Sequence, residues 1–165
     1  MIVISDTTPI ISLLKIKHLE LLRELFGEIW IPKAVYQELI SNERFSQEAR
    51  QIAKAAYVRR VEVEDLKSVN LLRRATGLDV DESEAIILSD ENKADILLMD
   101  EAKGRMVAKQ MGLTIMGTVG ILITAYDERL LTAQQIEQCI EILQVNGRHI
   151  SEKLYQQIRD KIMER

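Results

Sequence analysis

Short apolar runs alternate along the chain with longer stretches in which apolar residues recur every three or four positions. The short runs predict five strands, at residues 2–5, 29–31, 61–64, 96–99 and 113–116. The helix-spaced stretches predict helices at residues 9–14, 19–26, 32–40, 45–57, 65–76, 83–92, 103–111, 118–126, 132–144 and 151–163. Strands that alternate with helices favour a parallel sheet with right-handed crossovers, which is an α/β fold.

The length and composition fit one domain with an aliphatic core. A chain of 165 residues, of which 47% are apolar and 4% aromatic, can bury a substantial core built from Ile, Leu, Val, Met and Ala. We expect residues 1–125 to form the core of a single domain and residues 126–165 to form a helical C-terminal extension. Asp65, Thr132 and Ser151 are suitable N-cap residues for three of the predicted helices.

Charge and cysteine content limit the function classes. Lys and Arg number 22 and Asp and Glu number 26, so the net charge of −4 gives no general electrostatic surface for tight nucleic-acid binding. The single cysteine, Cys139, cannot form an intramolecular disulfide and is predicted to be a buried small hydrophobe. No apolar run is long enough for a membrane span, and the N-terminus does not resemble a signal peptide. We therefore expect a soluble cytoplasmic protein without a membrane partner.

Two predicted strands each end at an aspartate. Asp6 closes the first apolar run, and Asp100 closes the run at residues 96–99. Because the carboxyl ends of parallel strands share one edge of a sheet, we expect both carboxylates at the edge where such sheets bind ligands. Glu38 and Glu84 lie early in predicted helices and can face the same place.

Four carboxylates in one pocket repel one another, and a divalent cation removes that conflict. Mg²⁺ or Mn²⁺ suits a site built from carboxylates, and such a site suits hydrolysis of a phosphodiester. The two histidines, His18 and His149, are not predicted beside this edge, which disfavours a histidine-based mechanism. No Cys–His set is present for zinc.

Each acidic residue also has a structural explanation. Asp6 and Asp100 could cap the helices that follow them, and Glu38 and Glu84 could be solvated surface groups. Only the four together favour a site.

The neighbouring polar residues are ambiguous in the same way. Glu82 and Glu101 are candidate outer ligands, whereas Asp81 is predicted to be a solvated surface acid. Thr7 and Thr8 could orient a ligating carboxylate or simply cap the next helix.

The basic residues also allow two interpretations. Lys103, Arg105 and Lys109 could hold a phosphate backbone or form an exposed helix face. The pairs at residues 59–60 and 73–74 are predicted to be surface charge. Paired aromatics that would stack unpaired bases are not evident in the sequence.

Five passages in order, at residues 3–9, 31–39, 81–86, 97–105 and 112–120, resemble the PIN-domain family of metal-dependent ribonucleases. More narrowly, the chain resembles prokaryotic PIN-like proteins related to the toxins of toxin–antitoxin pairs. The resemblance implies a three-layer α/β/α fold with a central parallel sheet, here followed by a C-terminal helical hairpin. It also implies an acidic cleft that binds Mg²⁺ or Mn²⁺ and cleaves single-stranded RNA.

The resemblance also implies catalytic and metal-binding roles for particular acids. Asp6 matches the first acidic position of the family, Glu38 the second, and Asp100 the aspartate at the strand end. The third position falls on Glu84 by helix phase, with Glu82 as a rival.

The chain departs from the family pattern at two places. Asp81 stands where glycine is common in the subgroup, and Glu101 stands where a second aspartate is common. A fifth acidic position has no counterpart other than Glu101.

The first hypothesis is therefore a metal-dependent endoribonuclease, the toxin partner of an antitoxin protein. The alternative is a non-catalytic PIN-like module that binds protein or RNA. A receiver or aspartyl-phosphatase domain is disfavoured, because Asp6 is followed by Thr7 and Thr8 rather than by further acids. The resemblance implies a homodimer, and the apolar stripe of Ile136, Ile140 and Leu143 fits either a dimer interface or ordinary core packing.

Overall fold

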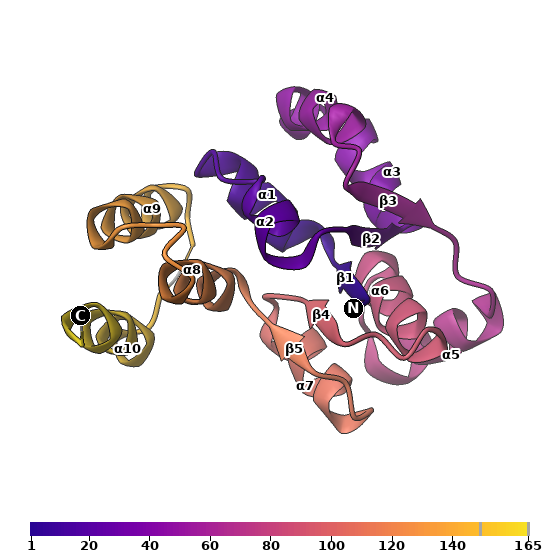
Figure 1. Cartoon of the computed structure of the whole chain (residues 1–165). Helices are drawn as coiled ribbons and strands as arrows, with labels where there is room; N and C mark the ends of the chain where they lie inside the picture. Colours follow the sequence, from indigo (N-terminus) through magenta and orange to yellow (C-terminus); the bar gives the residue numbers. More distant parts are fainter. Residues whose placement is uncertain (149, 165) are drawn as a thin grey trace.

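The structure is a computed structural model that describes residues 1–148 and 150–164, and its centre is a five-stranded parallel sheet (Figure 1). The strands are β1 (Val3–Ser5), β2 (Ile29–Pro32), β3 (Val58–Val61), β4 (Ile96–Leu98) and β5 (Ile115–Met116). Their order across the sheet is β3-β2-β1-β4-β5, and all neighbouring pairs are parallel. The prediction of an α/β fold with a parallel sheet is confirmed.

Helices connect the strands and continue beyond the last one. They are α1 (Thr7–Lys15), α2 (Leu21–Phe26), α3 (Lys33–Ser41), the 3₁₀ turn η1 (Glu43–Phe45), α4 (Ser46–Lys54), α5 (Leu66–Thr76), α6 (Val80–Glu91), α7 (Ala102–Gln110), α8 (Thr118–Asp127), α9 (Ala133–Val145) and α10 (Glu152–Met163). The N-cap predictions are confirmed, since the side chains of Asp65, Thr132 and Ser151 each accept a hydrogen bond from an amide in the first turn.

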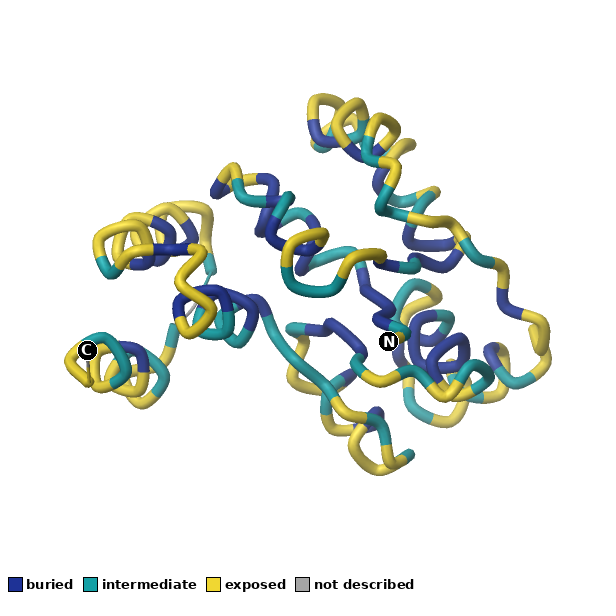
Figure 2. Tube along the Cα trace, in the orientation of Figure 1, coloured by how far each residue is buried: buried dark blue, intermediate teal, exposed yellow. Residues whose placement is uncertain are grey.

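Alternation of side chains along β1 places helices on both faces of the sheet. Val3 packs in a core cluster with α1, α2, α8 and α9, whereas Ile4 packs in a second cluster with α5, α6 and α7. Figure 2 shows the central strands buried and the outward helix faces exposed. The sheet therefore lies between two helical layers, as the PIN-like prediction required.

The C-terminal hairpin of α9 and α10 lies beside α8 (Figure 1). Ile136, Ile140 and Leu143 of α9 are buried in the same core cluster as β1 and α1. The apolar stripe in this helix is thus accounted for by packing within the chain. Cys139 is buried among these residues, as predicted, and burial raises the pKa of its thiol to about 11.

Most predicted elements agree with the structure to within two residues at each end, and three differ by more. The strand predicted at residues 61–64 is β3, which begins at Val58 because it pairs residue for residue with β2; Val63 lies after it and packs in the second core cluster. The helix predicted at residues 45–57 is α4, which ends at Lys54, and Phe45 belongs to the preceding turn η1. The helix predicted to begin at residue 83 begins at Val80, because the Asp79 side chain caps it.

The structure also bears on the predictions about membrane spans and about the two histidines. None of the helices in the described parts of the chain could span a membrane. His18 lies between α1 and α2 and pairs with Glu20, whereas His149 lies outside the described residues.

Candidate functional site

The centre of the sheet brings the ends of β1 and β4 together. Ser5 is in register with Leu98, and the backbone N–H of Asp6 donates to the carbonyl of Leu98 at 3.0 Å. Asp6 and Asp100 therefore follow adjacent strand ends, as expected. The strand order reverses direction here, which is the position at which open α/β sheets bind ligands.

Asp6 is buried and incompletely satisfied. Its residue is only 3% exposed, and its carboxylate Oδ1 is buried without a hydrogen-bond partner among the described residues. Although Asp6 occupies the N-cap position of α1, its side chain makes no capping hydrogen bond, so the capping explanation does not account for it. Burial, followed by the charges of Glu82, Asp79 and Asp81, raises the pKa of Asp6 to about 8, against the opposing effect of the Thr7 amide.

The first turn of α6 delivers two more acids to Asp6. The hydroxyl of Thr7 donates to Asp81 Oδ2 at 3.1 Å, which ties this turn to the start of α1. Burial and neighbouring acids raise the pKa of Asp81 to about 6 and that of Glu82 to about 7. Asp81 was expected to be solvated; it is instead half-buried, because α6 begins three residues earlier than predicted.

These acids line one cavity of about 520 Å³. Its acidic members are Asp6, Glu38, Asp79, Asp81, Glu82 and Glu101. Both candidate outer ligands are therefore present. The volume lies within the usual range of ligand sites, about 300–1,000 Å³.

Glu38 reaches this cavity from α3. Its Oε1 accepts a hydrogen bond from the Asn42 side chain at 3.2 Å, and the residue is half-buried. Asp6 and Glu38 are thus the two predicted site residues that the structure brings to the same cavity.

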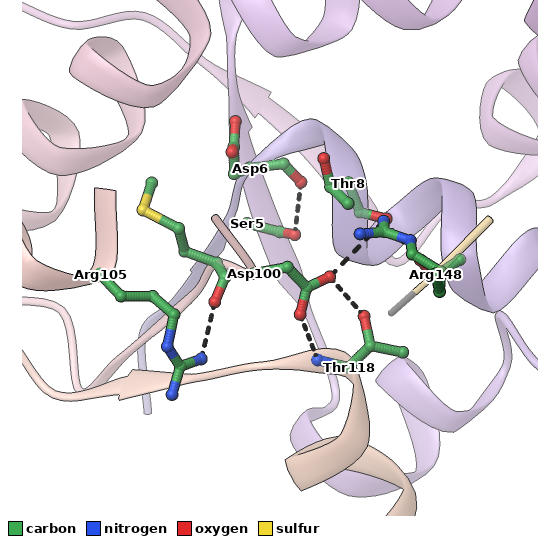
Figure 3. A network of polar contacts seen from close by, with 9 residues as sticks. Ser5, Asp6, Thr8, Asp100, Arg105, Thr118 and Arg148 are labelled. Carbon is green, nitrogen blue, oxygen red and sulfur yellow. Dashed lines mark hydrogen bonds and ion pairs between the residues drawn. The ribbon is translucent and has the colours of Figure 1, made fainter. Parts of the chain in front are cut away.

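Asp100 is turned to other partners. Its carboxylate accepts hydrogen bonds from the Thr118 amide at 2.7 Å and the Thr118 hydroxyl at 2.6 Å, and it lies 3.7 Å from Arg148 Nη2. Figure 3 shows Asp100 directed toward Thr118 and Arg148, with the Asp6 carboxylate pointing away from it. Asp100 lines a neighbouring cavity of about 560 Å³, and in this conformation it secures the start of α8.

Glu84 also has a separate role in the structure. Its Oε1 accepts a hydrogen bond from the Ala34 amide at 3.1 Å. Ala34 lies in the first turn of α3, where amides lack partners within the helix. Glu84 lines neither the cavity that contains Asp6 nor the one that contains Asp100.

A comparison with protein-family models identifies the family to which this chain belongs. The family model DUF3368, described as a PIN domain, matches residues 2–164. The chain belongs to the PIN-domain family. PIN domains are typically metal-dependent nucleases and are often toxins of toxin–antitoxin pairs. A search of curated proteins found no match.

The donor set of this PIN domain fits a hard divalent cation. Asp6, Asp81 and Glu82 offer carboxylate oxygens, and the unpartnered Asp6 Oδ1 supplies a ligand atom that makes no other bond. Across residues 1–148 and 150–164, no three acidic, histidine or cysteine side chains already converge in the geometry of a metal site. Cation binding would therefore need side-chain rotation toward Asp6. The bound cation would then offset the repulsion that, together with burial as the larger cause, raises the three pKa values.

The basic stretch after Asp100 divides between two roles in the PIN domain. Arg105 donates to the Met99 carbonyl at 2.9 Å and lines the cavity that contains Asp100. Lys103 and Lys109 are exposed on α7. Arg59 and Arg60 are exposed on β3 and lie over the rings of Trp30 and Tyr36, so they cover aromatic surface as well as carrying charge.

Sequence patterns alone missed the proximity of Asp81 to Asp6. The signal that indicates it is the spacing of Asp79 and Glu82, an N-cap residue followed three positions later by Glu, which marks a helix start at residue 80. From that start, Asp81 and Glu82 fall in the first turn, beside the end of β1.

Glu84 provides a direct test of how the acids divide their roles. Glu84→Ala should lower the free energy of unfolding by about 1–2 kcal/mol, because the Ala34 amide loses its acceptor. Glu84→Gln keeps an oxygen there and should cost less. Urea denaturation measures both effects. A decrease of about tenfold in Mn²⁺ affinity for Glu84→Gln would instead show that Glu84 is a metal ligand.

Proposed function

We propose that this PIN domain is a Mg²⁺- or Mn²⁺-dependent endoribonuclease that cleaves single-stranded RNA. The observation that carries the proposal is the buried Asp6 carboxylate, which has one unpartnered oxygen and faces a cavity with further acids. A buried carboxylate with a raised pKa destabilises the folded protein, so a functional reason for keeping it is expected.

Five residues of the cavity have distinct parts in this proposal. Asp6, Asp81 and Glu82 would hold the cation, and the Thr7 hydroxyl, which donates to Asp81, would fix the orientation of that carboxylate. Glu38, which lines the same cavity from α3, would orient a water by hydrogen bonding. When bound there, such a cation would lower the pKa of a water and stabilise charge on the phosphate.

We further propose that the protein is the toxin of a toxin–antitoxin pair and that an antitoxin protein restrains it. Family membership supports this part. Induced expression of the wild-type chain in a bacterial host should arrest growth, and Asp6→Asn should abolish the arrest. Growth arrest by both proteins would contradict the toxin proposal.

The nuclease proposal is tested by cleavage of labelled single-stranded RNA with Mg²⁺ or Mn²⁺. The wild-type protein should cleave, Asp6→Asn should lose at least about 100-fold in rate, and EDTA should stop the reaction. Asp100→Asn should lose less, because its partners are Thr118 and Arg148. Equal cleavage by wild-type and Asp6→Asn preparations would indicate a contaminating nuclease and reject the proposal.

One observation favours the alternative of a non-catalytic interaction module. The Asp100 carboxylate is already occupied by Thr118 and Arg148 rather than directed at Asp6. If folded wild-type protein binds no Mn²⁺ by calorimetry, the module is the better description.

A further inference from the structure

The cavity that contains Asp6 has a second wall of different chemistry. Besides the acids, it is lined by Arg44, Phe45, Asn146, Gly147 and Arg148. Arg44 and Phe45 come from η1, and the other three follow α9. The same arginines and Phe45 also line an adjoining cavity of about 220 Å³, so this wall continues away from Asp6.

Arg148 is held in place by one end of its guanidinium. Nη2 donates to Ser12 Oγ at 2.7 Å and to the Thr8 carbonyl at 3.3 Å, and the same atom lies 3.7 Å from Asp100. Figure 3 shows Arg148 between Thr8 and Asp100. For the described residues, all of these contacts use Nη2, which leaves Nη1 and Nε as donors. A guanidinium fixed in this way is suited to a phosphate oxygen.

Phe45 lines both cavities and, although half-buried, belongs to neither core cluster of the described structure. The Arg44 guanidinium lies 6.0 Å from the ring centroid. The chain has only two phenylalanines, so placing one of them on a cavity wall leaves an apolar surface that a ligand can cover.

The two walls together match the parts of a single-stranded nucleotide. A cation beside Asp6 attracts the phosphate to be cleaved, a guanidinium attracts the next phosphate, and an aromatic ring offers a stacking surface to an unpaired base. Duplex RNA cannot offer an unstacked base to that ring.

We infer that Arg44, Phe45 and Arg148 form a nucleotide-binding subsite beside the proposed cleavage site. Phe45 stacks on an unpaired base, Arg44 covers the ring and adds positive charge, and Arg148 donates to the phosphate of the same nucleotide. The subsite rests on the proposed function, since it gives that site its requirement for single-stranded RNA. It also assigns a role to the turn after α9, which brings Arg148 to a site built mainly from the first 101 residues.

The test is RNA binding by the full chain in EDTA, so that no strand is cut. Fluorescence anisotropy would follow two labelled probes, a short oligoadenylate and the same sugar–phosphate strand without bases. Phe45→Leu should weaken oligoadenylate binding by about tenfold and leave the base-free strand unchanged, and Phe45→Trp should restore the affinity. Arg148→Gln should weaken both probes and lower the salt slope by about 0.7.

Matched controls separate binding from folding. Arg159→Gln removes an arginine that also lies over an aromatic ring, Tyr155 on α10, and should leave both affinities unchanged. Thermal melts would show that the Phe45 variants remain folded. Because Phe45→Leu keeps the apolar bulk and Phe45→Trp restores the aromatic face, a purely structural role would not produce this pattern.

The outcomes distinguish this inference from the nuclease proposal. The subsite is refuted if wild-type protein fails to bind oligoadenylate, or if Phe45→Leu binds it as tightly as wild type. It is also refuted if Phe45→Leu weakens both probes equally. Metal-dependent cleavage with no Phe45 effect would leave the nuclease without this subsite. The Phe45 pattern without any cleavage would leave an RNA-binding module and reject the nuclease.

Discussion

Metal-free Asp6→Asn protein is expected to be more stable than wild type by at least about 2 kcal/mol at about pH 9. The wild-type protein must keep a buried carboxylate charged at that pH, although the pKa of Asp6 in the folded state is about 8. Asparagine has a similar shape and carries no charge. The gain in the free energy of unfolding is smaller than the value that corresponds to the full pKa shift. The reason is that the new amide also lies in a buried position with few partners.

The direction of the pH dependence follows from proton binding. The folded state raises the pKa of Asp6 from 3.8 to about 8, so between these values the folded state binds more protons than the unfolded state. Wild-type stability should therefore fall as pH rises from about 4 to about 8, and Asp81 and Glu82 add a fall of the same sign. Below about pH 4, Asp6 is protonated in both the folded and the unfolded state, so it no longer destabilises the folded protein. The advantage of Asp6→Asn should then disappear.

Urea denaturation across this pH range, with EDTA present, measures the effect. Asp90→Asn is a suitable control, because Asp90 is exposed near the end of the same helix that carries Asp81. It should follow the wild-type curve. If Asp6→Asn and wild type lose stability in parallel as pH rises, ionisation of the buried Asp6 carboxylate does not destabilise the folded protein.

Mn²⁺ should stabilise the wild-type protein far more at about pH 8 than at about pH 6. Metal ligands must be deprotonated, and the pKa values of Asp6 and Glu82, about 8 and about 7, keep both largely protonated at the lower pH. For each proton displaced, the apparent affinity should rise about tenfold per pH unit until the group is ionised. Binding only to the folded state then raises the melting temperature.

Melting curves with and without Mn²⁺ at a series of pH values measure this linkage. The increase in melting temperature should be small at about pH 6 and should reach its limit above about pH 8. Asp6→Asn should show little increase at any pH. A wild-type increase that does not change with pH would mean that the cation binds elsewhere, at carboxylates with ordinary pKa values.

The fold was predictable because its signals are local. Apolar runs that end in Asp6 and Asp100 gave the central parallel strands β1 and β4, and the structure places these ends side by side. The ends of helices and strands were less predictable where a single side chain determines them. Asp79 caps α6 so that it begins at Val80, and this start decides which acids line the cavity that contains Asp6.

Side-chain partners were less predictable because they come from distant segments. Glu82 and Glu84 are two residues apart on a helix with 3.6 residues per turn, so they point to nearly opposite sides. Glu82 faces the cavity that contains Asp6, and Glu84 faces α3. Asp100 meets Thr118 and Arg148, and the bond from Arg148 to Thr8 spans 140 residues. Helix periodicity and the positions of strand ends do not predict contacts between residues so far apart in the sequence.

The central claim, that Asp6 and the first turn of α6 bind a divalent cation, is tested most directly by calorimetric titration with Mn²⁺ at about pH 8. Wild-type protein should bind Mn²⁺, Asp81→Asn should bind it more weakly, and Asp6→Asn should show no binding. Glu84→Gln should bind as wild type does, because its oxygen is committed to the Ala34 amide. Equal Mn²⁺ affinity in Asp6→Asn and wild-type proteins would contradict the claim.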